Sequence, residues 1–260
     1  MWRVSALAAL VCAVFAAVAI GFASAATGAY GYVSEAGAPD APLRGLYRAG
    51  VLGIAAALAF LAVAIRESAR RTQLLRSTAP GSPSRWAVVS GLAVVPALVA
   101  AVPFAVVSAT VSCTPGCPLP PFESASHSDI VHALASIGGF GLAAGAMLLL
   151  AVDSMVDSGT AGVDPDATRR RGRSPGPRER QAARLGPASR VGAALLLPLL
   201  AATGLAMLVI GRGLLAGLLE RAAIVVALAW LGTVAAILAT TRSPAGAGAA
   251  ARSADMRRRT

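Results

Sequence analysis

Six long apolar stretches constrain the fold of this chain more than any other feature. Each runs for about 17 to 24 residues, close to the length that a helix needs to cross a hydrocarbon core of roughly 30 Å. A helix also satisfies its own backbone polar groups inside a bilayer. The sequence therefore predicts an all-α membrane protein, a six-transmembrane-helix bundle with short outer loops and a disordered basic cytoplasmic loop. The predicted spans are residues 4–25, 49–65, 87–109, 130–152, 191–210 and 222–240.

The composition supports this class. Of the 260 residues, 56% are hydrophobic and 13% are charged, which is more apolar side chain than a soluble domain of this size buries. The net charge of +11 is compatible with nucleic-acid binding, but the arginines lie in the connections between apolar stretches and only 5% of residues are aromatic. We therefore expect the lipid bilayer as partner, no nucleic acid and no cofactor.

The distribution of arginine predicts the orientation. All 23 basic residues are arginine, and nineteen of them lie in the N-terminal segment, the second-to-third and fourth-to-fifth connections and the tail. The opposite side has Arg44, Arg48, Arg212 and Arg221. Because positive residues resist translocation, both termini are predicted to be cytoplasmic. The use of arginine without lysine, with much alanine, indicates a GC-rich bacterium, so a bacterial plasma membrane is expected.

The predicted membrane domain covers residues 1–242, with a flexible cytoplasmic loop at 153–190 and a disordered tail at 243–260. Residues 24–26 resemble a signal-peptidase site, so cleavage of the first span stays open. Its apolar core exceeds the roughly 7 to 15 residues of a signal peptide, which favours a retained helix. None of the six stretches contains Asp, Glu or Arg, and this argues against proton-coupled transport.

Chemically reactive side chains gather between residues 113 and 132. Cys113 and Cys117 flank a Pro-Gly turn that brings them within disulfide range, and the loop is expected in an oxidising compartment. We predict a disulfide. The alternative is a zinc site in which His127 and His132 complete a set of four ligands with the two thiolates.

Ser126 and Asp129 match a capping box at the start of the fourth span. His132 shares a helix face with Asp129 and Ser136, so a hydrolase built on His132 is a second interpretation of the same residues. The absence of a recognisable oxyanion hole disfavours an enzyme.

The loop after the first span supplies further polar groups. Glu35 or Asp40 is expected to pair with Arg48 near the interface. We predict an outward-facing ligand site from these loops. Its candidate residues are Ser34, Glu35, Arg48, Glu123, His127 and His132.

Two motifs in these loops resemble a family of bacterial multi-pass membrane proteins catalogued as domain of unknown function 998. They are Tyr-Val-Ser-Glu-Ala-Gly-Ala-Pro at residues 32–39, and Cys-Thr-Pro-Gly-Cys-Pro from Cys113, which His132 follows. The second has the form found in actinobacterial members. The resemblance covers about residues 4 to 240 and implies six transmembrane helices, a shared outer site at Ser34, Glu35 and His132, and no established activity.

The leading functional hypothesis is a non-enzymatic plasma-membrane protein that binds a lipid or small ligand at the outward-facing site. A membrane-embedded hydrolase or metal-dependent enzyme that uses His132 is the first alternative, and a scaffold for partner membrane proteins is the second.

Overall fold

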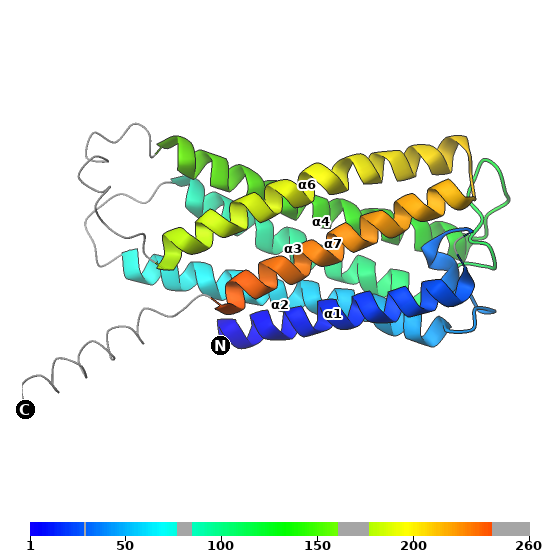
Figure 1. The fold of residues 1–260 in the computed structure, drawn as a ribbon, viewed down its shortest axis with the longest axis horizontal. Coiled ribbons are helices and arrows are strands. Elements are labelled where there is room, and N and C mark those ends of the chain that lie inside the picture. The colour runs from blue at the N-terminus through cyan, green and yellow to red at the C-terminus, as the bar shows by residue number, and fades with distance from the viewer. Residues whose placement is uncertain (29, 77–84, 161–176, 241–260) are drawn as a thin grey trace, which may run out of the picture.

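The residues that the structure describes fold mainly into six long α-helices (Figure 1). The computed structural model describes residues 1–28, 30–76, 85–160 and 177–240. Within these residues there is no strand, and the six long helices are each long and apolar enough to cross a membrane. The prediction of a six-helix bundle is therefore confirmed. In chain order the elements are α1 (Trp2–Thr27), the 3₁₀-helix η1 (Val33–Gly37), α2 (Arg44–Arg76), α3 (Arg85–Thr110), α4 (His127–Thr160), α6 (Pro177–Val209) and α7 (Leu214–Thr240).

Several helices extend beyond the apolar stretches that predicted them. α4 continues to Thr160 and α6 begins at Pro177, so helix occupies both ends of the loop predicted at 153–190. Residues 161–176 and the predicted tail at 243–260 lie outside the described residues. Hydropathy locates only the part of a helix that can lie in hydrocarbon, whereas the helix itself continues as long as its backbone hydrogen bonds do.

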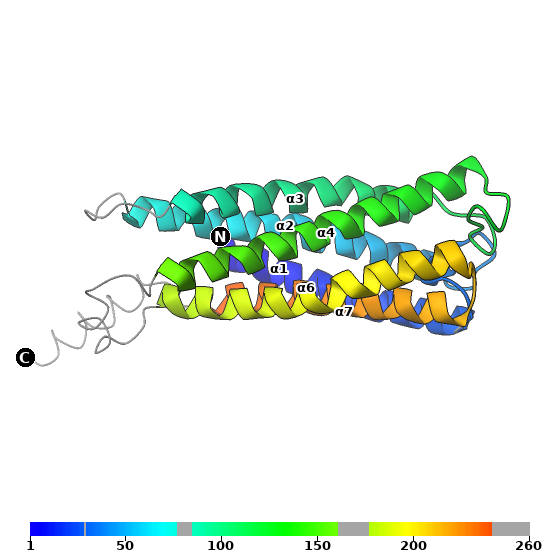
Figure 2. The same ribbon diagram turned by 90° about the horizontal axis from the view of Figure 1, so that it is seen from above.

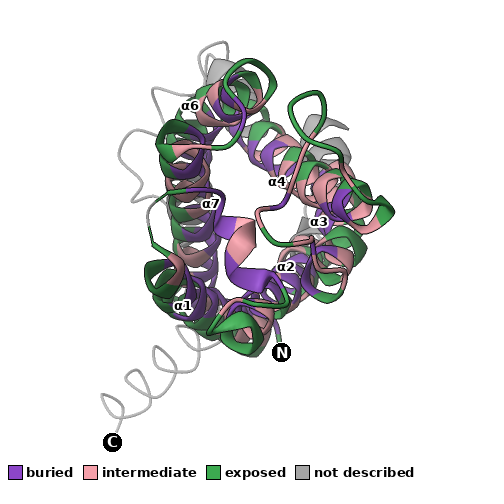
Figure 3. Cartoon of the chain, turned by 90° about the vertical axis from the view of Figure 1, so that its right-hand side faces the viewer, coloured by how far each residue is buried: buried purple, intermediate pink, exposed green. Residues whose placement is uncertain are grey.

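The six helices form a closed ring (Figure 3). Each packs against its neighbours in chain order, and α7 returns to α1. Figure 2 shows the helices running along one common long axis. Side-chain bonds join adjacent members: the indole Nε1 of Trp230 on α7 donates to Ser189 Oγ on α6 at 3.2 Å, and Arg3 Nε on α1 donates to the Ala239 carbonyl oxygen on α7 at 2.9 Å.

Small residues let these helices approach closely. Alanines dominate the buried positions of α1, where Ala6, Ala13 and Ala16 have at most 2% of their surface exposed. The largest side chains with less than 2% of their surface exposed come from the other helices: Leu61, Leu98, Met147, Leu196 and Leu238. Tight packing of small residues is the usual basis of helix association in a bilayer, where hydrocarbon solvates large apolar side chains as well as the core does.

The two ends of the bundle differ. The N-terminus lies at the same end as the last residues of α2, α4 and α7 (Figure 1), which is the arginine-rich end. At the other end lie the chain between α1 and α2, the chain between α3 and α4, and the short turn between α6 and α7. We call this the cap end, because η1 lies across the ring there (Figure 3).

Candidate functional site

Residues 30–38, which we call the cap, close one end of the helix ring. Gly28 and Gly31 have φ angles of 89° and 110°, and these let the chain turn sharply away from the end of α1. η1 follows, and Tyr32, Val33, Ala36 and Ala38 are each at most 3% exposed. The cap is therefore packed into the bundle as part of its core.

Side chains of α7 hold the cap in place. Glu220 Oε2 accepts the Val33 N–H at 2.6 Å, at the start of η1 where a helix leaves donors unpaired. Arg221 donates from Nη1 to the Gly31 carbonyl oxygen at 3.1 Å and from Nη2 to that of Gly28 at 2.7 Å. Glu220 thus binds a backbone N–H group and Arg221 binds backbone carbonyl oxygens, so two consecutive residues of α7 hold Gly28, Gly31 and Val33.

Glu35 binds the start of the cap to the turn between α6 and α7. It accepts the Tyr32 N–H at 2.9 Å and forms a two-pronged salt bridge with Arg212, whose Nε lies 2.7 Å from Oε1. The bond to Glu35 raises the pKa of Arg212 above its ordinary value. The sequence analysis paired Arg48 with Glu35 or Asp40; instead Arg48 donates to Ser112 Oγ. The turn between α6 and α7 places Arg212 beside the cap, and nothing in the linear sequence shows this.

The loop between α3 and α4 lies beside the cap. The sulfur atoms of Cys113 and Cys117 are at disulfide distance, with Cα atoms 5.0 Å apart, so the predicted pairing is confirmed. The Cys113 sulfur lies 3.8 Å from the Ser34 carbonyl oxygen. Because the cysteines pair with each other, the four-ligand zinc alternative is not assembled. No group of three or more His, Cys, Asp or Glu side chains among the described residues is arranged to hold a metal.

Asp129 anchors the same loop to α4. Its carboxylate accepts the Thr114 N–H at 2.6 Å and the Ser126 N–H at 2.8 Å, while the Asp129 N–H donates to Ser126 Oγ at 3.3 Å. The reciprocal bonds with Ser126 are those of a capping box, so this prediction is confirmed. The carboxylate does not bond to the imidazole of His132.

His132 is 5% exposed and has one free ring nitrogen. Nδ1 lies 2.8 Å from the Val111 carbonyl oxygen, which can only accept, so we assign the proton of the neutral ring to Nδ1. Nε2 then carries a lone pair, and it has no hydrogen-bond partner. Ser136 Oγ donates to the His132 carbonyl oxygen at 3.0 Å and does not contact the ring nitrogens. The Ser/His/Asp arrangement considered from the sequence is therefore not formed.

Two small cavities lie inside the ring beneath the cap. The first has a volume of about 70 Å³, and its polar lining includes Tyr32, Ser34, His132, Ser136 and Glu220. The second, of about 90 Å³, also borders Ser136 and Glu220 and extends to Ser108 and Tyr47. The two cavities thus share Ser136 and Glu220 in their linings. Burial, together with the nearby carboxylates of Glu220, Glu123 and Glu35, raises the pKa of Tyr32 to about 12, so its hydroxyl group keeps its proton.

The structure therefore separates the predicted site residues into three groups. Ser34 and His132 meet at the smaller cavity. Glu35 and Arg48 are held in the contacts just described. Glu123 and His127 are exposed and line neither cavity.

Sequence reasoning did not include Glu220 or Arg221 among the candidate site residues, because the last span was predicted over residues 222–240. The helix begins at Leu214, so both residues lie within it. The predicted span 222–240 itself contains no Asp, Glu or Arg, but α7 extends beyond it toward the N-terminus and includes both residues. A signal was available: Glu220 follows Leu214, Leu215, Leu218 and Leu219, an apolar run at helical spacing.

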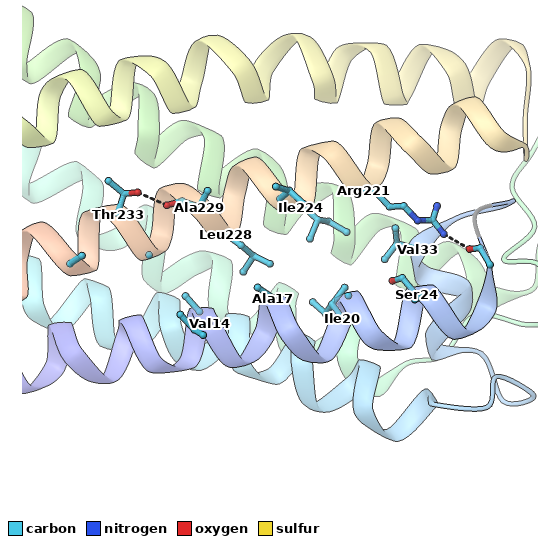
Figure 4. A pocket seen from close by; sticks show the side chains of 17 residues that line it. Val14, Ala17, Ile20, Ser24, Val33, Arg221, Ile224, Leu228, Ala229 and Thr233 are labelled. Carbon is cyan, nitrogen blue, oxygen red and sulfur yellow. Dashed lines mark hydrogen bonds between the residues drawn. The ribbon is translucent and has the colours of Figure 1, made fainter.

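A third hollow lies between α1 and α7. This groove has a volume of about 920 Å³. Figure 4 shows Val14, Ala17 and Ile20 of α1 facing residues of α7, with Arg221 at one end. Apart from Arg221, Ser24 and Thr233, the lining side chains are apolar or glycine.

No family model, curated protein or solved structure matches this chain. The resemblance to domain of unknown function 998 therefore stays a prediction.

Proposed function

We propose that this chain is a bacterial plasma-membrane protein, with both termini cytoplasmic, that binds a membrane lipid in the α1–α7 groove. The observation that carries the proposal is the groove itself, which is apolar along its length and has a guanidinium group at its cap end. Its volume of about 920 Å³ is near the upper end of the range typical of ligand sites. The two cavities inside the ring are far too small for a lipid.

The lining residues match the two parts of a lipid. Along α7 they run from Arg221 to Ala236, about 22 Å at the rise of an α-helix, which suits an acyl chain. The guanidinium of Arg221 binds backbone carbonyl oxygens and forms no salt bridge with a described residue, so its charge is available to an anionic headgroup.

Filling the groove tests this proposal. A Cβ added at Gly21, which lines the groove, meets no atom within 4 Å, so Gly21→Leu should occupy the groove without disturbing the fold. We expect the variant to lose most of the lipid that remains on the wild-type protein after delipidation, as measured by native mass spectrometry. The reason is that the leucine side chain replaces the acyl chain.

Gly141→Leu is the matched control, since Gly141 is also an exposed helical glycine with open space around its Cβ but lies on α4. It should retain lipid at the wild-type level. Equal lipid retention by the two variants would contradict the proposed site. Anionic phosphatidylglycerol should also be retained in preference to phosphatidylcholine.

The proposed orientation has its own test. A reporter enzyme fused after Gly116, at the cap end, should show extracytoplasmic activity, and one fused after Gly172 should show cytoplasmic activity. The physical reason is the excess of arginine in the connections at the other end. The opposite pattern would overturn the orientation.

A further inference from the structure

We use the name polar chamber for the two cavities beneath the cap, whose linings share Ser136 and Glu220. Most other residues that line the larger cavity are apolar, and the lipid groove does not account for the polar ones. With volumes of about 70 and 90 Å³, each cavity has room for about two or three water-sized molecules. The chamber therefore selects for a ligand of a few atoms.

Its lining presents hydrogen-bond acceptors. With the ring proton on Nδ1, His132 offers an unpartnered lone pair at Nε2 although the residue is 95% buried. Ser136 donates its only hydroxyl hydrogen to the His132 carbonyl oxygen. The 3.0 Å contact between Ser108 Oγ and Ser136 Oγ must then use the hydrogen of Ser108. The hydroxyl groups of Ser108 and Ser136 have therefore donated their hydrogens, and toward a ligand they can only accept hydrogen bonds.

Glu220 adds a buried carboxyl group that forms no salt bridge with a described side chain. One carboxylate oxygen accepts the Val33 N–H, and the side chain borders both cavities. Arg221, its neighbour in the chain, directs its guanidinium to the carbonyl oxygens of Gly28, Gly31 and Gly217. A buried charge is costly unless it is paired, so a cation in the chamber and the ionised form of this carboxyl group would stabilise each other.

We propose that the polar chamber binds a small monocation that donates hydrogen bonds, of the ammonium or methylammonium class, between the Glu220 carboxylate and His132 Nε2. Such a cation carries several N–H donors and no lone pair, which complements His132 Nε2, the Glu220 carboxyl oxygens and the lone pairs of Ser108 and Ser136. The hydroxyl groups of Tyr32 and Tyr47 border the chamber and can accept as well. A water molecule can satisfy Nε2, but it supplies no positive charge to pair with a carboxylate at Glu220.

The experiment measures the thermal unfolding midpoint of the purified full-length protein at constant ionic strength. Sodium chloride is replaced stepwise by ammonium, methylammonium or tetramethylammonium chloride. We expect a saturable rise in the midpoint with ammonium and methylammonium, because a ligand that binds only the folded state stabilises it. Tetramethylammonium, which is larger and has no N–H donor, should behave like sodium. An ammonium response equal to that of sodium would overturn the proposal.

Variants assign the response to the chamber. Glu220→Gln keeps the shape of the side chain and removes its charge, and His132→Phe removes the Nε2 lone pair. Each should weaken the apparent affinity for ammonium at least tenfold. The exposed residues Glu123 and His127 supply matched controls, and Glu123→Gln and His127→Phe should respond like the wild type.

The proposal is wrong if the folded variants Glu220→Gln and His132→Phe respond to ammonium like the wild type; if one of them does not fold, the other decides. Gly21→Leu should keep the full ammonium response whether or not it loses lipid. The two sites can therefore fail independently.

Discussion

Replacing Asp129 with alanine is expected to lower the free energy of unfolding by about 2–4 kcal/mol. The carboxylate is 2% exposed and accepts the backbone N–H groups of Thr114 and Ser126 as well as both hydroxyl groups. Alanine leaves these donors without a partner and releases the disulfide loop from the first turn of α4. Denaturant or thermal unfolding of the purified protein measures the change.

Two other variants serve as comparisons for the loss of stability in Asp129→Ala. Asp129→Asn keeps one acceptor oxygen and should be intermediate. Asp40→Ala removes an exposed carboxylate from the chain between α1 and α2 and should change stability by less than about 0.5 kcal/mol. If Asp129→Ala were no more destabilising than Asp40→Ala, the carboxylate would not anchor the loop.

The second large effect is expected from Gly217→Ala, at the closest approach of α7 to the cap. A Cβ at this position would lie 2.1 Å from the Gly31 carbonyl oxygen and 2.8 Å from Arg221 Nη1. The cap backbone must move away, so the variant should lose about 1–3 kcal/mol of stability. Hydrogen exchange should also become faster at the Val33 amide, since displacement of the cap weakens its bond to Glu220.

Gly204→Ala is the control for helix propensity. It also replaces a glycine inside a long helix, but its Cβ meets no atom within 4 Å, so it should gain up to about 1 kcal/mol. Destabilisation by both substitutions, to the same extent, would argue against a specific contact at Gly217.

Three features of the cap end were predictable from the sequence because each depends on neighbours in the chain. The Cys113–Cys117 pairing requires only a turn across a few residues. The capping box joins Ser126 to Asp129 over one helical turn. The position of His132 in the first turns of α4 follows from the same register.

The contacts of the cap could not be predicted, because they join residues far apart in the chain. Glu35 had several possible cationic partners in the cap-end loops, and hydropathy does not distinguish Arg48 from Arg212. Glu220 was missed for a related reason. A prediction from hydropathy ends a span at a charged residue. In the folded protein a carboxyl group can nevertheless lie inside a helix, because a backbone N–H group of another segment, here that of Val33, binds it.

The sequence by itself determined the all-α class, the six long apolar helices and the cysteine pairing in the disulfide loop, since apolar length and short-range spacing are properties of the chain alone. The tertiary structure decided which polar groups meet. Closure of the six helices into a ring brings α7 beside the cap, and packing of the cap across that ring encloses Ser34, His132 and Glu220 around one cavity. Such a juxtaposition depends on the order and rotation of the helices, and hydropathy does not encode either one.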